Sequence, residues 1–223
     1  MFGSFYQLSI SLGIVISLIS LRKNSGRERF IQKVIVFILL WVLVLESIGN
    51  YTASRGINNS ALYNFGFIFL ESFMLIYYFS LIETSLQFKK KVWIFCGLFI
   101  LWGFINSYLF QPITLEFQFF SFLPFALLIL FLAIRFLIRV MQMKVYAQKN
   151  LIRLPHFWIS WVVIIFYLEA LCLFGSYQFY PSFVLDNVTF LFSVNQIIAG
   201  LMYVTFGLAF LFPSFTSNKL PLA

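Results

Sequence analysis

Charged residues are scarce in this chain: only 10% of its 223 residues are Asp, Glu, Lys or Arg, while 62% are hydrophobic. A water-soluble domain is about a quarter charged, so this composition excludes an ordinary soluble globule. No hydrophilic stretch is long enough to fold separately. We therefore expect residues 1–223 to form a single membrane domain.

Residues that serve metal and covalent chemistry are just as rare. The two cysteines, Cys96 and Cys172, lie in apolar runs, and the chain has one histidine, His156, and one aspartate, Asp186. These counts exclude a disulfide framework, a histidine-based zinc site, the paired aspartates of an intramembrane protease and the Ser/His pair of a rhomboid. The last apolar run has no lysine for a retinal Schiff base. We expect no catalytic residue, no metal and no cofactor, and we interpret His156 as a lipid headgroup contact.

What the sequence does contain is a series of apolar runs, each long enough to cross a bilayer. The hydrocarbon core needs about 20 residues of helix, and helices satisfy their own backbone in lipid. The mean hydropathy is +0.96. The sequence predicts an all-α bundle of seven transmembrane helices, with spans at 4–21, 31–52, 61–84, 92–110, 118–138, 157–177 and 188–212.

The basic residues predict how the bundle is oriented. Of the 15 Lys and Arg residues, only Arg55 falls among the loops of one side. The positive-inside rule assigns the other side to the cytoplasm. This predicts an N-terminus outside, a C-terminus inside, and a multi-pass protein of a cell membrane, the bacterial inner membrane. The net charge of +8 follows from this topology, so we expect the lipid bilayer as partner and no nucleic acid.

A few polar residues interrupt the spans and are the candidates for function. Polar groups are costly in hydrocarbon, so each one is a functional hypothesis. Glu71 and Glu169 lie near the middle of their spans and would form the core of a site. The surrounding candidates for ligand or proton binding fall in the predicted outer half of the membrane: Glu46, Asn195, Gln196, Asn64 and Asn50.

These residues are compatible with several functions. Carboxyl groups buried without a base are expected to be protonated at neutral pH, so they could donate hydrogen bonds or relay protons. The first hypothesis is a sensor or receptor-like component with an outward-facing pocket for a small or lipophilic ligand and a separate cytoplasmic partner protein. The second is a small-solute or proton-coupled transporter, and the third is an intramembrane lipid-modifying enzyme. Alternatively, the acids, amides and tyrosines only hydrogen-bond the helices together.

Three resemblances accompany this interpretation. The layout of the spans resembles that of rhodopsins and G-protein-coupled receptors. Glu46 and Glu169 are 123 positions apart, and Glu71 and Asn195 are 124 apart, which suggests a parallel repeat similar to the PQ-loop and SWEET transporters, although their Pro-Gln pair is missing. The stretch Leu62-Tyr63-Asn64 followed by Glu71 resembles a pattern of small uncharacterised seven-helix bacterial inner-membrane proteins, a resemblance that implies no activity.

Overall fold

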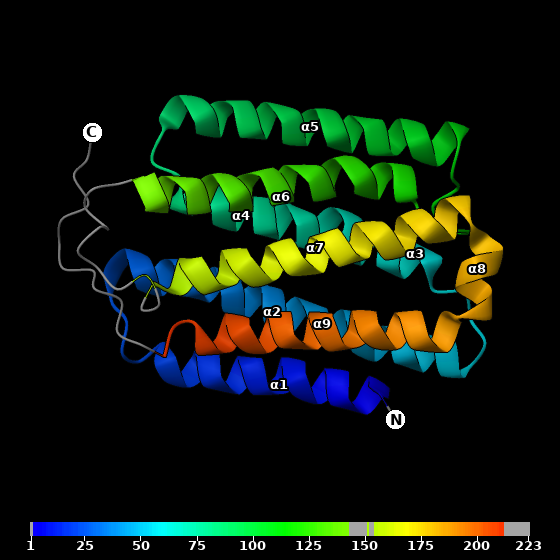
Figure 1. Cartoon of the computed structure of the whole chain (residues 1–223), viewed down its shortest axis with the longest axis horizontal. Coiled ribbons are helices and arrows are strands. Elements are labelled where there is room, and N and C mark those ends of the chain that lie inside the picture. The colour runs from blue at the N-terminus through cyan, green and yellow to red at the C-terminus, as the bar shows by residue number, and fades with distance from the viewer. Residues whose placement is uncertain (1, 143–150, 152–153, 212–223) are drawn as a thin grey trace.

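The chain folds as a bundle of long helices that lie side by side (Figure 1). The computed structural model describes residues 2–142, 151 and 154–211. In this part of the chain, six helices are long and apolar enough to cross a membrane, and a shorter apolar helix, Phe5–Ser20, precedes them. The protein is therefore an all-helical, polytopic membrane protein.

The helices follow the predicted spans with small shifts at their ends. In chain order they are α1 (Phe2–Ser20), α2 (Gly26–Ser54), α3 (Ser60–Tyr63), the π-helix η1 (Asn64–Glu71), α4 (Ser72–Ile82), α5 (Leu86–Leu109), α6 (Phe119–Gln142), α7 (Pro155–Phe179), α8 (Pro181–Asp186) and α9 (Val188–Leu208). The helices α3, η1 and α4 are continuous and make one span, Ser60–Ile82. α2 and α5 begin earlier than hydropathy predicted, because their first turns are polar. The short helix α8 was not predicted.

Local signals at several helix ends explain where the chain turns. The Ser85 hydroxyl accepts a hydrogen bond from the Phe88 backbone N–H at 3.3 Å and caps the start of α5. Pro155 and Pro181 lie in the first turns of α7 and α8, where no intrahelical N–H is needed. Just after α2, Gly56 takes a φ of +67°, which a residue with a Cβ rarely adopts.

Six of the apolar helices close into a ring, and α5 lies outside it. α1 packs against α2 and α9, the Ser60–Ile82 span connects α2 to α6, and α7 fills the place between α6 and α9. α5 lies at the edge of the bundle, against α6 (Figure 1). Its buried residues are few: Val92, Cys96, Gly103 and Asn106. The interior of the ring is where polar side chains from different helices meet.

The helices α1 and α9 pack unusually closely. A Cβ built on Gly13 would lie 2.5 Å from the Tyr203 carbonyl oxygen, and one built on Gly207 would lie 2.7 Å from the Gly13 Cα. Gly200 faces the Ser9 side chain in the same way. Small residues let two helix backbones approach, as in other membrane helix pairs. Tyr203, whose backbone lies against Gly13, has a side chain that is 1% exposed.

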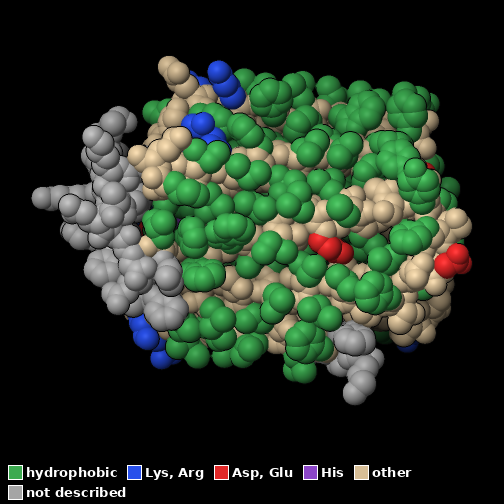
Figure 2. All heavy atoms as spheres, viewed as in Figure 1, with side chains coloured by type: hydrophobic (Ala, Val, Ile, Leu, Met, Phe, Trp, Pro, Cys, Tyr) green, Lys and Arg blue, Asp and Glu red, His purple; other side chains and the backbone are tan. Residues whose placement is uncertain are grey.

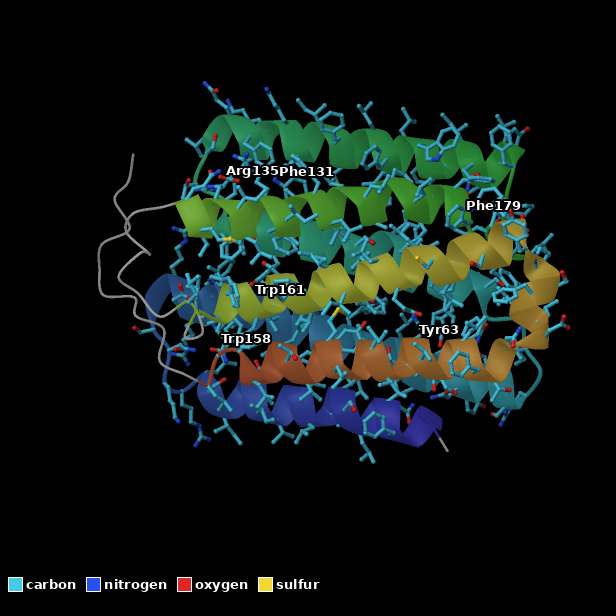
Figure 3. The ribbon with its side chains drawn as sticks, viewed as in Figure 1. Tyr63, Phe131, Arg135, Trp158, Trp161 and Phe179 are labelled. Atoms are coloured by element: carbon cyan, nitrogen blue, oxygen red, sulfur yellow. The ribbon has the colours of Figure 1, made fainter. Side chains whose placement is uncertain are left out.

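One end of the bundle carries nearly all the described basic residues, and we call it the basic end. Lys and Arg side chains gather there, while the long flanks are hydrophobic (Figure 2). Trp158 and Trp161 of α7 lie toward this end, and Tyr63 toward the other, which we call the opposite end (Figure 3). Lys144, Lys149, Arg153 and Lys219, used in the prediction of orientation, lie outside the described residues. That the basic end faces the cytoplasm stays a prediction from charge.

Candidate functional site

Glu71 is buried at the midpoint of the span Ser60–Ile82, and its side chain belongs to the interior of the ring. It is 1% exposed and is the last residue of the π-helix η1. Such wide turns within α-helices occur frequently at functional sites, because they change the direction in which side chains project. The Tyr203 hydroxyl of α9 donates a hydrogen bond to Glu71 Oε1 at 2.7 Å.

A second carboxyl group lies close enough to interact with Glu71. Glu46 of α2 accepts a hydrogen bond from the Tyr63 hydroxyl at 3.2 Å and interacts electrostatically with Glu71. Gly49 makes room for this contact, because a Cβ there would collide with the Tyr63 hydroxyl. Tyr63 is the residue before η1 and Glu71 is its last residue. Both contact residues of neighbouring helices. Two carboxyl groups with two phenol donors thus occupy one region of the interior.

Two more tyrosines complete this region. The Tyr6 ring of α1 lies 6.1 Å from the Tyr203 ring, and Tyr6 interacts electrostatically with both glutamates. Tyr167 of α7 is 0% exposed and also interacts with Glu71. Among the described residues its hydroxyl has no well-aligned hydrogen-bond partner, although the Ser72 side chain lies beside it. We call these six residues the carboxylate–tyrosine cluster: Glu46, Glu71, Tyr6, Tyr63, Tyr167 and Tyr203.

The cluster contains no cation to balance its acids. The ion pairs in the described part of the chain involve Glu83 and Glu28, both at the basic end, and neither Glu46 nor Glu71 takes part. A buried charge is costly unless it is paired, so these two carboxyl groups are suited to take up a proton or a small cation. Among the described residues, no three His, Cys, Asp or Glu side chains converge as metal ligands would.

Glu169, the other acid predicted for the core of the site, forms a separate pair. Asn195 of α9 donates a hydrogen bond from Nδ2 to Glu169 Oε2 at 2.7 Å. Both residues are partly exposed, and an acidic side chain reaches the otherwise apolar face over α7 in Figure 2. No interaction between described residues connects Glu169 with Glu71. Gln196, next to Asn195, makes no hydrogen bond to another described side chain.

The candidate residues Asn64 and Asn50 lie in different surroundings. Asn64 is fully buried, and its Nδ2 donates to the carbonyl oxygens of Ile113 and Glu116 at 2.8 and 2.7 Å. Its Oδ1 accepts from the Gln118 backbone N–H at 3.0 Å. This side chain therefore holds the connection between α5 and α6 and has little capacity left for a ligand. Asn50 is exposed near the end of α2.

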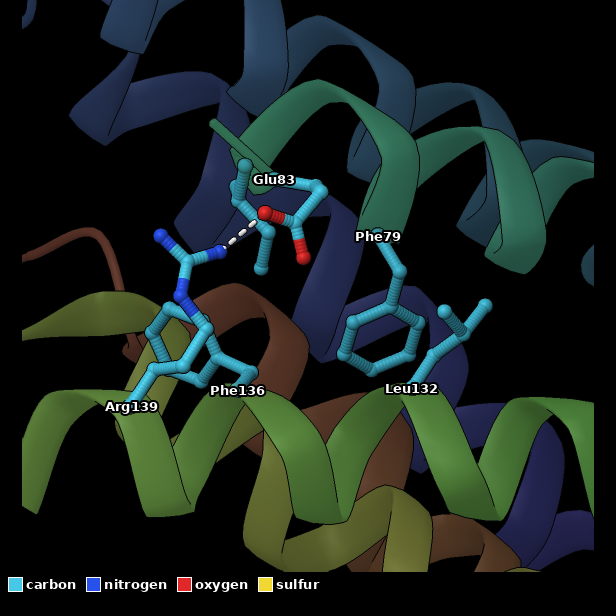
Figure 4. Close-up of a pocket in the computed structure, with 6 residues that line it drawn as sticks. Phe79, Glu83, Leu132, Phe136 and Arg139 are labelled. Carbon is cyan, nitrogen blue, oxygen red and sulfur yellow. Dashed lines mark hydrogen bonds and ion pairs between the residues drawn. The ribbon is translucent and has the colours of Figure 1, made fainter. Parts of the chain in front are cut away.

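At the basic end, Glu83 connects α4 with α6. Arg135 Nε lies 3.0 Å from Glu83 Oε2, Arg139 contacts the other oxygen, and the Thr84 and Ser85 backbone N–H groups donate to that oxygen as well. Although burial raises the pKa of this carboxyl, the hydrogen bonds from Ser85 and Arg135 and the charge of Arg139 lower it below its ordinary value. Beside the ion pair is a cavity of about 10 Å³, room for one water molecule (Figure 4).

The tyrosines are what the sequence reasoning did not assign to the site. Gly200, Tyr203 and Gly207 are spaced three and four residues apart, as on one helix face, and the two glycines lie against α1. Which tyrosine meets which acid depends on contacts between helices far apart in sequence, so no local signal indicates it. Comparison with protein-family models, curated proteins and solved structures finds no match to this chain.

Proposed function

We propose that this membrane protein is a proton-coupled transporter, with Glu71 as its central protonation site and Glu46 as a second. The observation that carries the proposal is a carboxyl group at the midpoint of a span, 1% exposed, bonded to a tyrosine and unpaired with any cation among the described residues. Intramembrane acids of this kind mark proton relays and ion pathways.

The neighbours of Glu71 supply the chemistry that reversible protonation needs. The Tyr203 hydroxyl donates to the Glu71 carboxyl oxygen at 2.7 Å and fixes its orientation. Tyr167 and Tyr6 place two further hydroxyl groups within electrostatic reach. When Glu46 and Glu71 are both charged, they repel each other. A proton bound by either carboxyl group removes this repulsion, so the singly protonated pair is more stable than the doubly charged pair.

Glu46 lies nearer the opposite end of the bundle than Glu71, because it precedes the end of α2 at Ser54 by only two turns. It is also less buried than Glu71. We assign Glu46 the role of exchanging protons with the opposite side and Glu71 the role of carrying them across the middle. The transported solute would be small, because the interior around the cluster is densely packed with aromatic rings.

Reconstituted vesicles test the proposal. With a pH gradient and a potential imposed, the wild-type protein should move protons, either alone or with a solute from a panel of small metabolites. Glu71→Gln should abolish the flux, since glutamine is nearly isosteric and cannot release a proton. Glu116→Gln is the matched control, because Glu116 is exposed in the loop before α6. Equal flux in the wild type and in Glu71→Gln would refute the assignment.

One observation favours a second candidate, a sensor component that binds a lipophilic ligand. The Glu169–Asn195 pair is partly exposed on an apolar face, where a polar group of a ligand dissolved in the bilayer could reach it. The loops of the basic end would then engage a cytoplasmic partner protein. A ligand should raise the melting temperature of the wild type and not of Glu169→Gln. Glu71→Gln should leave that shift intact, which separates the two functions.

A further inference from the structure

Three titratable side chains from three helices meet in the interior at the basic end. The Tyr78 hydroxyl of α4 lies 2.8 Å from Nδ1 of His156, the second residue of α7. On the other side of the imidazole, Nε2 lies 3.6 Å from Oε2 of Glu28, which belongs to the first turn of α2. We call these residues the Tyr78–His156–Glu28 triad.

The triad is buried, and this corrects the interpretation of His156 as a lipid headgroup contact. Tyr78 is 0% exposed and His156 is 6% exposed. The rings of Tyr78, Phe136 and Phe210 surround the imidazole, with centroids 5.8, 6.1 and 6.1 Å away. The sequence suggests a surface position for His156, because this residue follows Pro155 at the start of a predicted span. The packing of α2, α4 and α6 around the first turn of α7 covers it.

The geometry gives each nitrogen of the imidazole a partner through which a proton can pass. In the neutral ring one nitrogen is a donor and the other an acceptor, so histidine can take a proton at one side and release it at the other. Tyr78 faces one nitrogen, and Glu28 faces the other. Glu28 Oε2 makes no hydrogen bond within the described residues, and its contact with Nε2 at 3.6 Å is an ion pair when the imidazole is protonated.

The charges around the triad are few. Arg27, next to Glu28 on α2, interacts electrostatically with it and donates a hydrogen bond to the Leu81 carbonyl oxygen at 2.6 Å. α4 contributes only the Tyr78 hydroxyl, while α6 and the residues after α9 contribute the apolar rings of Phe136 and Phe210. Glu28 is therefore the charged side chain that contacts the imidazole.

The triad lies on the same span as Glu71, between the centre of the bundle and the basic end. Tyr78 follows Glu71 by two helical turns, so about 10 Å separates them along the helix axis. Tyr167 and Ser72 place hydroxyl groups beside Glu71 at the beginning of this interval. Buried apolar side chains such as Leu75 fill the rest of the interval between Glu71 and Tyr78. A proton would therefore need buried waters, or a movement of α9, to pass from one to the other.

We propose that the Tyr78–His156–Glu28 triad is the proton-exchange site at the basic end of the pathway whose centre is Glu71. This inference rests on the proposed transport of protons. In the step toward the basic end, the Tyr78 hydroxyl gives its proton to Nδ1 and takes up another from the side of Glu71, while Nε2 gives its proton to Glu28. The phenol and the imidazole are then both neutral, and the proton is on the Glu28 carboxyl group. Glu28 is the member that meets water, because its side chain is 14% exposed.

If the role of the triad were purely structural, its contacts would hold the three helices together and its side chains would not change their protonation. The chain has a single histidine, so protein labelled with ¹⁵N-histidine and purified through a histidine-free tag gives one set of imidazole signals. In a proton-exchange site these signals should show more than one form of the ring as the pH of the sample is varied, because the two neutral tautomers and the protonated ring differ in their ¹⁵N shifts. Tyr78→Phe should shift the Nδ1 signal, and Glu28→Gln should shift the Nε2 signal. An imidazole that keeps one form at every pH at which the protein stays folded would overturn the proposal.

Proton flux provides the second test. His156→Gln and Glu28→Gln should slow the flux by about a hundredfold, the range of a lost acid–base group. The loss should depend on the pH at the basic end and not on that at the opposite end. Lys90→Gln is the control, because Lys90 is an exposed titratable residue of the same end. Circular dichroism and gel filtration would verify that each variant folds.

The outcomes separate this inference from the proposed function. If Glu71→Gln stops the flux while His156→Gln and Glu28→Gln leave it at the wild-type rate, the triad is structural and the transport proposal stands. If the wild type moves no protons, or Glu71→Gln changes nothing, the proposed function fails and the exchange role of the triad fails with it.

Discussion

The hydrogen bond between Tyr203 and Glu71 allows the protonation of Glu71 to be tested through stability. Tyr203→Phe removes one hydroxyl from an aromatic side chain that is 1% exposed, and leaves the rest of the packing unchanged. Glu71→Leu removes the acceptor, whereas glutamine would keep one. The four proteins of this double-mutant cycle isolate the contribution of the pair.

The expected coupling depends on the charge of Glu71. A hydrogen bond between neutral groups contributes about 0.5–1.5 kcal/mol, and one to a charged group about 1.5–3 kcal/mol. Side-chain hydrogen bonds between membrane helices average about 0.6 kcal/mol. A neutral Glu71 therefore predicts a coupling free energy of about 1 kcal/mol at neutral pH.

Reversible unfolding in mixed detergent micelles would measure this coupling. Tyr177→Phe is the control, since Tyr177 is 41% exposed on α7. A coupling below about 0.3 kcal/mol would lie within ordinary additivity and would show that the bond does not form. A coupling above about 2 kcal/mol would indicate a charged carboxylate and would contradict the proposed protonation at that pH.

Three further predictions concern the packing and the ends of the bundle. Gly207→Val should lower the free energy of unfolding by about 1–3 kcal/mol, because its Cβ meets the Gly13 backbone; Gly97→Ala, with open space around it, should not. Asn64→Ala should lower the free energy of unfolding by about 1–3 kcal/mol, because three backbone groups lose their partner. The connection between α5 and α6 should then become accessible to protease. The folded pKa of Glu83 lies below its unfolded value, so its stabilisation is present at neutral pH and is lost as the pH falls through the folded pKa. Glu83→Gln should therefore lower the melting temperature at neutral pH and flatten its decline in acid.

The sequence was sufficient for six long apolar helices with a shorter one before them and for the burial of Glu71, because both follow from the cost of polar groups in lipid. Asn64, Glu71 and Tyr78 recur every seven residues, the spacing of one helix face, and the structure buries all three. Their partners lie on three different segments of the chain. Those partners could not be predicted, because they depend on which helices are neighbours in the ring.

Glu169 illustrates the same limit of local reasoning. Its depth in the span matches that of Glu71, but α7 turns it toward α9 and Asn195. If the suggested repeat is applied, Glu169 and Asn195 occupy the places of Glu46 and Glu71, and each of these two pairs interacts. In the second half of such a repeat the contact is kept, but the amide of Asn195 stands where the first half has the acid Glu71. Glu46 and Glu71 are then the pair in which two carboxyl groups meet.

Infrared spectroscopy of the reconstituted protein tests the protonation of Glu71 most directly. A protonated carboxyl group gives a C=O stretching band that is separate from those of carboxylates and amides. We predict such a band at neutral pH in the wild type and in Glu116→Gln, and a smaller band in Glu71→Gln. If the band is the same in Glu71→Gln as in the wild type at every pH, Glu71 does not carry the proton and the account is contradicted.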